Sequence, residues 1–120
     1  MSIATNVIRK LRLPVIGSPL FIISTPDLVI AQCKAGIVSS FPALSAREEV
    51  NASVHSYGGI VFHDVINQTF AHKAVDKGAD GLILVAAGAG GHAGTTSPFA
   101  FVQETRQWFD GPIALSGANR

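Results

Sequence analysis

Charge is scarce in this sequence. Only 14% of its 120 residues are charged, whereas 48% are hydrophobic, and the formal net charge is +1. Lysine and arginine form no cluster that could provide the concentrated basic face of a nucleic-acid-binding protein, so we exclude a nucleic-acid partner. A chain with so little charge is expected to bury much of its surface, as parallel strands covered on both faces do.

The sequence also has only one cysteine and no long hydrophobic run. The single cysteine, Cys33, cannot form an internal disulfide. The N-terminal region has no continuous apolar stretch typical of a signal peptide, and no segment has the length of a membrane span. No cysteine and histidine residues have metal-ligand spacing, so we expect no metal site. These absences predict a cytoplasmic protein without a membrane partner, and the length predicts a single domain over residues 1–120.

Short apolar segments alternate with helical ones along the chain. Strands are predicted near residues 13–17, 35–40, 58–65, 78–87 and 111–117. Helices are predicted between them, over residues 26–36, 45–59, 67–78 and 97–111, with Ser97 as an N-cap and glycines beyond their ends. Strict alternation of strand and helix predicts an α/β fold with about five parallel strands and four helices.

A glycine-rich stretch, "AAGAGGHAG" over residues 86–94, directly follows the apolar run "GLILV". In parallel α/β folds this position, the carboxyl end of a strand, is where ligands bind. The glycines allow the backbone to approach a ligand closely, and His92 could act there as a general base or donate to an anion. The alternative is a long turn with an exposed histidine. A dinucleotide fingerprint is disfavoured because the following helix is predicted to begin only at Pro98.

Several stretches together resemble nitronate monooxygenase, the family formerly called 2-nitropropane dioxygenase. They include "LPVIGSPLFIIS", "GGIVFHDVIN", "GADGLILVAAGAGGHAG" and "FDGPIALSGA". The resemblance implies an FMN-dependent TIM barrel that oxidises nitronates or nitroalkanes with O2. It assigns removal of the substrate's α-proton, or binding of the nitronate, to His92. It assigns flavin contacts to Gly17, Ser18, Pro19, Leu20, Gly90 and Gly91, and FMN phosphate contacts to Ser116, Gly117 and Ala118.

The chain departs from a complete barrel of this family. By comparison with the family it jumps near residues 45–50 from the second strand to the helix before the fifth, and it ends before the eighth. A partial TIM-type barrel is therefore expected, with an open doubly wound sheet as the alternative fold. Unpaired strand edges predict self-association, and the missing walls predict weak FMN binding. The alternative function is a catalytically inactive fragment that acts as a weak flavin-binding, phosphate-binding or strand-pairing module.

The sequence leaves the roles of some other residues open. His63 and Asp64 end a predicted strand, where they either contact substrate or flavin phosphate or are satisfied locally. Asp64 stands where several members of the family carry Lys, and Leu20 where several carry Met, so no family role is transferred to Asp64. His55 and His72 are expected to be solvated helix residues. Cys33, Trp108 and Phe109 are expected to be core residues.

Overall fold

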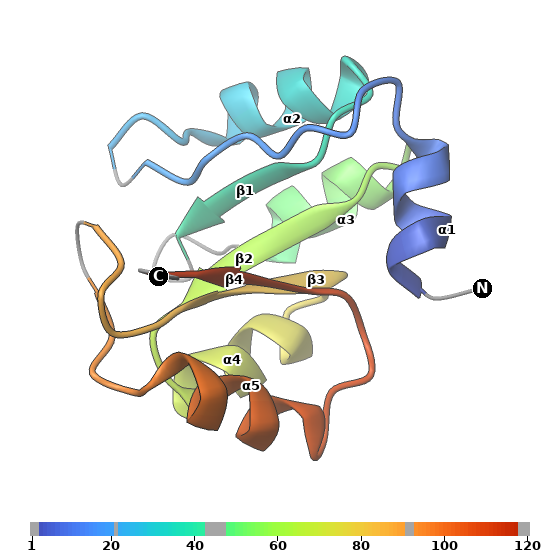
Figure 1. Ribbon diagram of the computed structural model, residues 1–120. Coiled ribbons are helices and arrows are strands. Elements are labelled where there is room, and N and C mark those ends of the chain that lie inside the picture. Colours follow the sequence, from blue (N-terminus) through green and yellow to red (C-terminus); the bar gives the residue numbers. More distant parts are fainter. Residues whose placement is uncertain (1–2, 21, 43–47, 91–92, 118–120) are drawn as a thin grey trace.

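The structure is a computed structural model that describes residues 3–20, 22–42, 48–90 and 93–117. Four strands form one parallel sheet in the order in which they occur along the chain. They are β1 (Ser39–Pro42), β2 (Val61–Val65), β3 (Gly81–Val85) and β4 (Ile113–Ser116). All four carboxyl ends therefore lie at one end of the sheet, at the left in Figure 1.

Local sequence explains where three of the helices begin. Helices α2 (Pro26–Lys34), α4 (Gln68–Asp76) and α5 (Pro98–Arg106) are each preceded by an N-cap side chain that accepts a backbone N–H of the first turn. The caps are Thr25, Asn67 and Ser97. Helix α3 (Glu48–His55) carries two glutamates in its first turn, which suit the positive end of the helix dipole.

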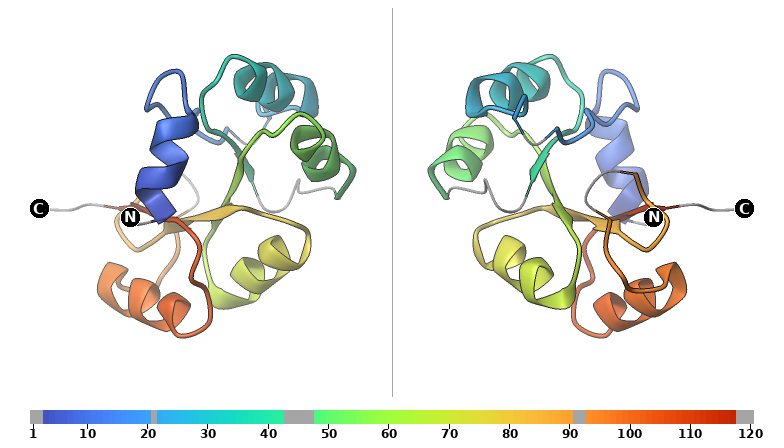
Figure 2. Two further views of the ribbon diagram at one scale, coloured as in Figure 1. Left: turned by 90° about the vertical axis from the view of Figure 1, so that its right-hand side faces the viewer. Right: turned by 90° about the vertical axis from the view of Figure 1, so that its left-hand side faces the viewer.

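The helices that connect the strands all lie on the same face of the sheet, as the end-on views in Figure 2 show. Consecutive parallel strands joined by right-handed crossovers place every connecting helix on one face when the strand order follows the sequence. A doubly wound sheet would instead carry helices on both faces. The arrangement is thus that of a partial barrel, and the α/β fold expected from the sequence is confirmed.

The sheet separates two apolar layers because strand side chains alternate between its faces. On the outer face, Leu82 and Leu84 are fully buried against α4 and α5, with Phe101 among their partners. A neighbouring outer cluster joins α2, α3 and β2 through residues that include Val29, Cys33, Val50, Val54 and Val61. On the inner face, Val38, Phe62 and Ile83 pack against residues of α1 (Ile3–Lys10) and the turn after it.

Two expectations about the number of elements are wrong. The predicted strand at 13–17 makes a single bridge, between Ile16 and Val38, so the sheet has four strands instead of about five. The N–H of Val15, which would extend this pairing, donates to the carbonyl of Leu13 instead, and the carbonyl of Gly17 accepts the hydroxyl of Ser40 instead of a backbone group. Helix α1 was not predicted, and it brings the number of helices among the described residues to five instead of four.

The resemblance implied missing strands near residues 45–50, and the strands on either side of this region pair directly. Strand β1 lies beside β2 in parallel, with Ser39 opposite Val61 and Ser40 opposite Phe62. Residues 43–47 lie outside the described residues. The two strands therefore become neighbours although a complete barrel of the family would place other strands between them.

Replacing Leu84 by alanine tests the outer core. Leu84 is fully buried, so Leu84→Ala is expected to lower the free energy of unfolding by about 2–5 kcal/mol through lost burial and a residual cavity. Leu20→Ala is the matched control because Leu20 is 49% exposed, and it should cost much less. Urea denaturation of both variants measures the difference. Equal losses would show that β3 is not packed as described.

Candidate functional site

The glycine loop, the end of β4 and the end of the N-terminal segment gather at the carboxyl end of the sheet (Figure 1). The loop leaves β3 directly and returns to it. The N–H of Ala86 donates to the carbonyl of Ser116 at 2.9 Å, and the N–H of Gly94 donates to the carbonyl of Val85 at 3.2 Å. The first and last described parts of the loop are thus fixed to β3 and β4.

Glycine is required where the loop closes onto the strands. A Cβ atom at Gly94 would lie 2.5 Å from the carbonyl oxygen of Val85 and 2.8 Å from that of Ile66. Gly88 has a φ of 91°, which a side chain rarely adopts. The backbone therefore turns tightly over the carboxyl ends of β2 and β3, as the glycine content predicted.

Gly90 differs from these glycines because its surroundings are open. A Cβ atom there would meet no atom within 4 Å, and Gly90 is exposed. Gly117 lies beside the same loop, since a Cβ atom on it would be 3.4 Å from the carbonyl oxygen of Ala87 and 4.0 Å from the N atom of Ala89. The structure thus brings the predicted flavin contacts Gly90, Ser116 and Gly117 to one side of the carboxyl end.

The other predicted flavin contacts, Gly17, Ser18, Pro19 and Leu20, lie at the same end of the sheet but beyond β1. Gly17 is fixed there, because its N–H donates to the carbonyl of Val38 at 2.8 Å and its carbonyl accepts the hydroxyl of Ser40 at 2.5 Å. Leu20 and Ser24 are bonded reciprocally, each through a contact of 2.8 Å. In the order of the sheet, β1, β2 and β3 lie between this segment and β4, although both groups are at the same end.

His92, Gly91 and Ala118 lie outside the described residues. The catalytic role of His92, the flavin contact of Gly91 and the phosphate contact of Ala118 therefore stay predictions. What the structure establishes is the position of their immediate neighbours: Gly90 and Ala93 flank the first two, and Gly117 precedes the third.

His63 points away from this end of the sheet toward α3. Of the two roles left open for it, the structure shows the local hydrogen bond and not a contact at the candidate site. Its Nε2 atom lies 3.2 Å from Oδ1 of Asn51. The amide nitrogen of Asn51 donates to the carbonyl of Lys77 at 2.6 Å, which leaves Oδ1 as the acceptor and places the proton on Nε2 of His63. Because strand side chains alternate, His63 lies on the face opposite Phe62 and Asp64, and Phe62 belongs to the inner cluster.

Asn51 was not predicted to have a structural or functional role. It is 2% exposed and stands three residues before Val54, on the buried side of α3. That helical spacing was the available signal. Asp80 makes two further hydrogen bonds in this region. Its Oδ2 atom accepts one from the N–H of Val61 and one from Nε2 of His55, each at 2.8 Å. These polar groups attach α3 to β2 and stabilise the fold; they form no part of the candidate site.

Cys33, Trp108 and Phe109 have the structural roles that were expected. The Cys33 side chain is buried, and burial raises the pKa of its thiol, which disfavours the reactive thiolate. Phe109 is buried in the outer core, and Trp108 packs against it while its indole N–H donates to Gln68 at 3.0 Å. His72 is exposed, as expected, and stacks on Trp108 with 3.6 Å between ring centroids.

Charged side chains are divided between the two ends of the sheet. At the carboxyl end, the described charges are carboxylates: Asp27, Glu48 and Glu49 in the first turns of helices, and Asp64 at the end of β2. The described lysines and arginines lie at or near the helix C-termini and strand N-termini, at the amino end. Arg47 and Arg120 lie outside the described residues. A phosphate at the carboxyl end would therefore depend on backbone N–H groups, with no described cation beside it.

None of the described helices has both the length and the hydrophobicity to cross a bilayer. Within the same residues, no three His, Cys, Asp or Glu side chains group as metal ligands would. Among the described residues, the groups at the carboxyl end include backbone amides, hydroxyls and carboxylates.

The burial of His63 predicts a pH-dependent stability. Burial is the largest cause that lowers the pKa of His63, to about 4 from 6.5; Lys77 adds to it and Asp80 opposes it. As the pH falls below 6.5 the unfolded chain takes up the proton first, so stability is complete above pH 6.5 and is lost toward pH 4. At about 1.4 kcal/mol per pH unit the loss is about 3 kcal/mol.

Urea denaturation between pH 7.5 and pH 4 measures this loss. His63→Gln keeps a donor for Asn51 but does not titrate, so it should remove most of the pH dependence. The control is His72→Gln, which changes an exposed histidine and should leave the dependence intact. A wild-type profile that His63→Gln does not alter would contradict the assignment.

Comparison with solved structures supports the fold. The chain is similar to FabK from Thermotoga maritima, with a TM-score of 0.65 and 21% identity over 92% of this chain and 36% of that one. A FabK point mutant from the same organism gives a TM-score of 0.68 and 19% identity over 98% of this chain and 42% of that one. No family model and no curated protein matches the chain. The chain spans less than half the length of either FabK chain, and likeness at this identity concerns the fold alone.

Proposed function

We propose that the chain binds FMN at the carboxyl end of its sheet and acts as a flavin-dependent oxidoreductase on nitronates or nitroalkanes. The observation that supports this most is the position of the glycine loop. Its open residue, Gly90, lies on the same side as Gly117 and Ser116, at the end of a partial barrel where ligands of such folds bind. The resemblance to nitronate monooxygenases supports the choice of FMN and of the substrate class.

The described residues fit the flavin ring better than its phosphate. A planar ring needs a bare backbone to lie against, and Gly90 offers one with open space around it. The phosphate is a dianion, and the described charges at this end are carboxylates. Backbone N–H groups near Ser116 and Gly117 would have to hold it. We therefore propose weak FMN binding, with a smaller contribution from the phosphate than in sites that pair it with arginine.

A bound flavin would supply the electron acceptor that protein side chains lack. The chain's own contribution would be His92, which would take the α-proton of a nitroalkane on its imidazole and so produce the nitronate. The carboxylate of Asp64, at the end of β2, has a negative charge and would not assist binding of an anionic nitronate. Because the chain spans less than half of its structural neighbours, the alternative of a flavin-binding module without catalysis is kept.

Filling the space at Gly90 tests the flavin site. Gly90→Val adds a branched side chain where nothing is within 4 Å, so the fold should persist while the close approach of the ring is blocked. Titration by quenching of flavin fluorescence should show FMN binding weakened by about tenfold or more. Ala35→Val is the control, because Ala35 is exposed at the amino end of the sheet. Unchanged binding by Gly90→Val would remove the glycine loop from the site.

Replacement of His92 tests the catalytic proposal. A positioned general base contributes about 10²- to 10⁴-fold, so His92→Asn should reduce turnover of a neutral nitroalkane by that order. A preformed nitronate has already lost its α-proton and should be affected much less. Oxygen consumption with the two substrates measures both rates. Equal losses would show that His92 acts in binding instead, and no turnover of either substrate by the wild-type chain would support the module without catalysis.

A further inference from the structure

The two outer edges of the parallel sheet are complementary to each other, and this complementarity does not depend on the proposed function. One edge is β4 and the other is the segment 13–16 beside β1. We propose that two copies of this chain pair edge to edge in parallel, β4 of each with segment 13–16 of the other, about a two-fold axis along the strands.

Backbone groups at the β4 edge point outward. The carbonyls of Pro112 and Ser116 accept N–H groups from β3, at 3.1 and 2.9 Å. Because the backbone groups of successive strand residues point to opposite sides, those of Ile113 and Leu115 point away from β3. This edge therefore offers two N–H donors and two carbonyl acceptors to another strand.

The segment 13–16 presents a matching edge. Val15 and Gly17 bond to Val38 of β1, so the backbone groups of Ile16 point away from β1. A parallel register with Ile16 opposite Ala114 of the second copy would form two bonds. Ile16 would donate to Ile113, and Leu115 would donate to Ile16.

The missing N–H of Pro14 leaves no carbonyl of β4 without a hydrogen-bond donor in this register. The carbonyl that would face the missing N–H of Pro14 is that of Gly111, and it already accepts Nη1 of Arg106 at 2.6 Å. The facing side chains are also compatible, since Ile16 and Ala114 both line an apolar groove on the inner face of the sheet. On the outer side, Val15 would lie beside Ile113, and Leu13 and Leu115 would also lose exposed surface; they are now 56% and 38% exposed.

Charge complementarity supports a second copy as the occupant. The pairing brings Arg12, which directly precedes segment 13–16, to the same end of the paired edges as Asp110, which precedes β4. Both residues are exposed in the single chain. A two-fold axis would form this pair twice, and each chain supplies one partner from each edge.

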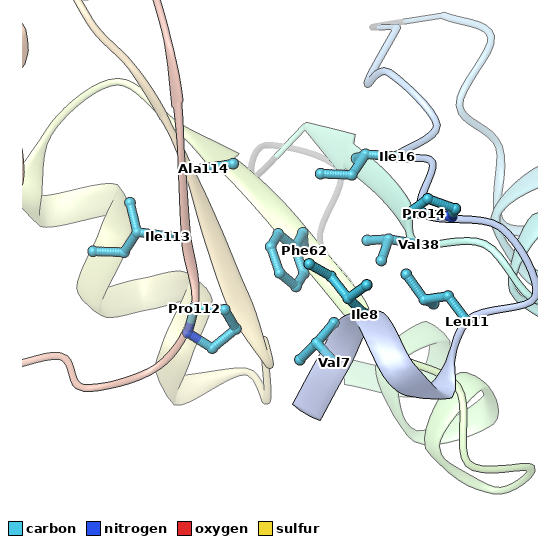
Figure 3. Close-up of a pocket in the computed structure, with 10 residues that line it drawn as sticks. All are labelled: Val7, Ile8, Leu11, Pro14, Ile16, Val38, Phe62, Pro112, Ile113 and Ala114. Carbon is cyan, nitrogen blue, oxygen red and sulfur yellow. The ribbon is translucent and has the colours of Figure 1, made fainter. Parts of the chain in front are cut away.

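An apolar groove lies where the second copy would dock. It has a volume of about 210 Å³ and lies between α1 and β4, with Phe62 between them (Figure 3). Ile8 borders the groove and is 55% exposed. Pro14 and Ile16 of the second copy would point toward this groove, and their apolar side chains suit its lining.

Charge reversal tests the pairing. Wild-type chain at about 100 μM should sediment as a dimer, at twice the 12.5 kDa of one chain. Arg12→Asp or Asp110→Arg alone should weaken dimerisation by about tenfold or more, because like charges then face each other twice. The double variant should restore it. Asp76→Arg, which reverses an exposed acidic residue outside both edges, should have little effect.

Hydrogen exchange gives a second readout that does not depend on charge. The amides of Ile16 and Leu115 should become protected as the protein concentration rises, because each donates across the edge only in the pair. A monomer at about 100 μM, a dimer in which these amides stay unprotected, or a charge reversal that the double variant does not rescue would each overturn the proposal. Open-ended polymers would overturn the closed two-fold form.

Discussion

The packing of Leu82 and Leu84 against α4 and α5 holds β3 at the centre of the sheet, and the rest of the structure depends on it. With β3 fixed, β2 and β4 pair in parallel on either side, and right-handed crossovers place the connecting helices on one face. The carboxyl ends of all strands then meet at one end. The glycine loop is therefore positioned by an apolar core that lies below it.

Much of this arrangement could be predicted from local sequence. Ser97 and Pro98 specify the start of α5, and the apolar runs at 58–65, 78–87 and 111–117 contain β2, β3 and β4. Two features could not be predicted locally. The segment 13–17 has strand-like composition, but the Val15 N–H donates to Leu13 and the Ser40 hydroxyl occupies the Gly17 carbonyl, which limits the segment to one bridge. Helix α1 was missed although Ile3, Val7 and Leu11 recur at helical spacing; the contact of Val7 with the inner face, which stabilises it, is tertiary.

The candidate site was predicted in part. The position of the glycine loop beside Gly117, at Ala87 and Ala89, follows from the parallel sheet, because strands that are neighbours end side by side. The separation of Gly17 from this group follows from the strand order, which the sequence alone left open. His63 was ambiguous because a histidine at a strand end faces either a ligand or a helix. Its register opposite Leu82, on the outer face, decides the matter, and register depends on tertiary pairing.

Mapping the flavin by amide chemical shifts tests the central claim most directly, namely that ligand binds at the carboxyl end of a partial barrel. FMN titrated into isotopically labelled chain should shift the amides of Gly88, Gly90 and Gly117 first, with the amides of α1 and the groove beside β4 unaffected. Shifts confined to the groove, at residues such as Ile8 and Ala114, would contradict the account, because the ligand would then occupy the amino-terminal side of the inner face.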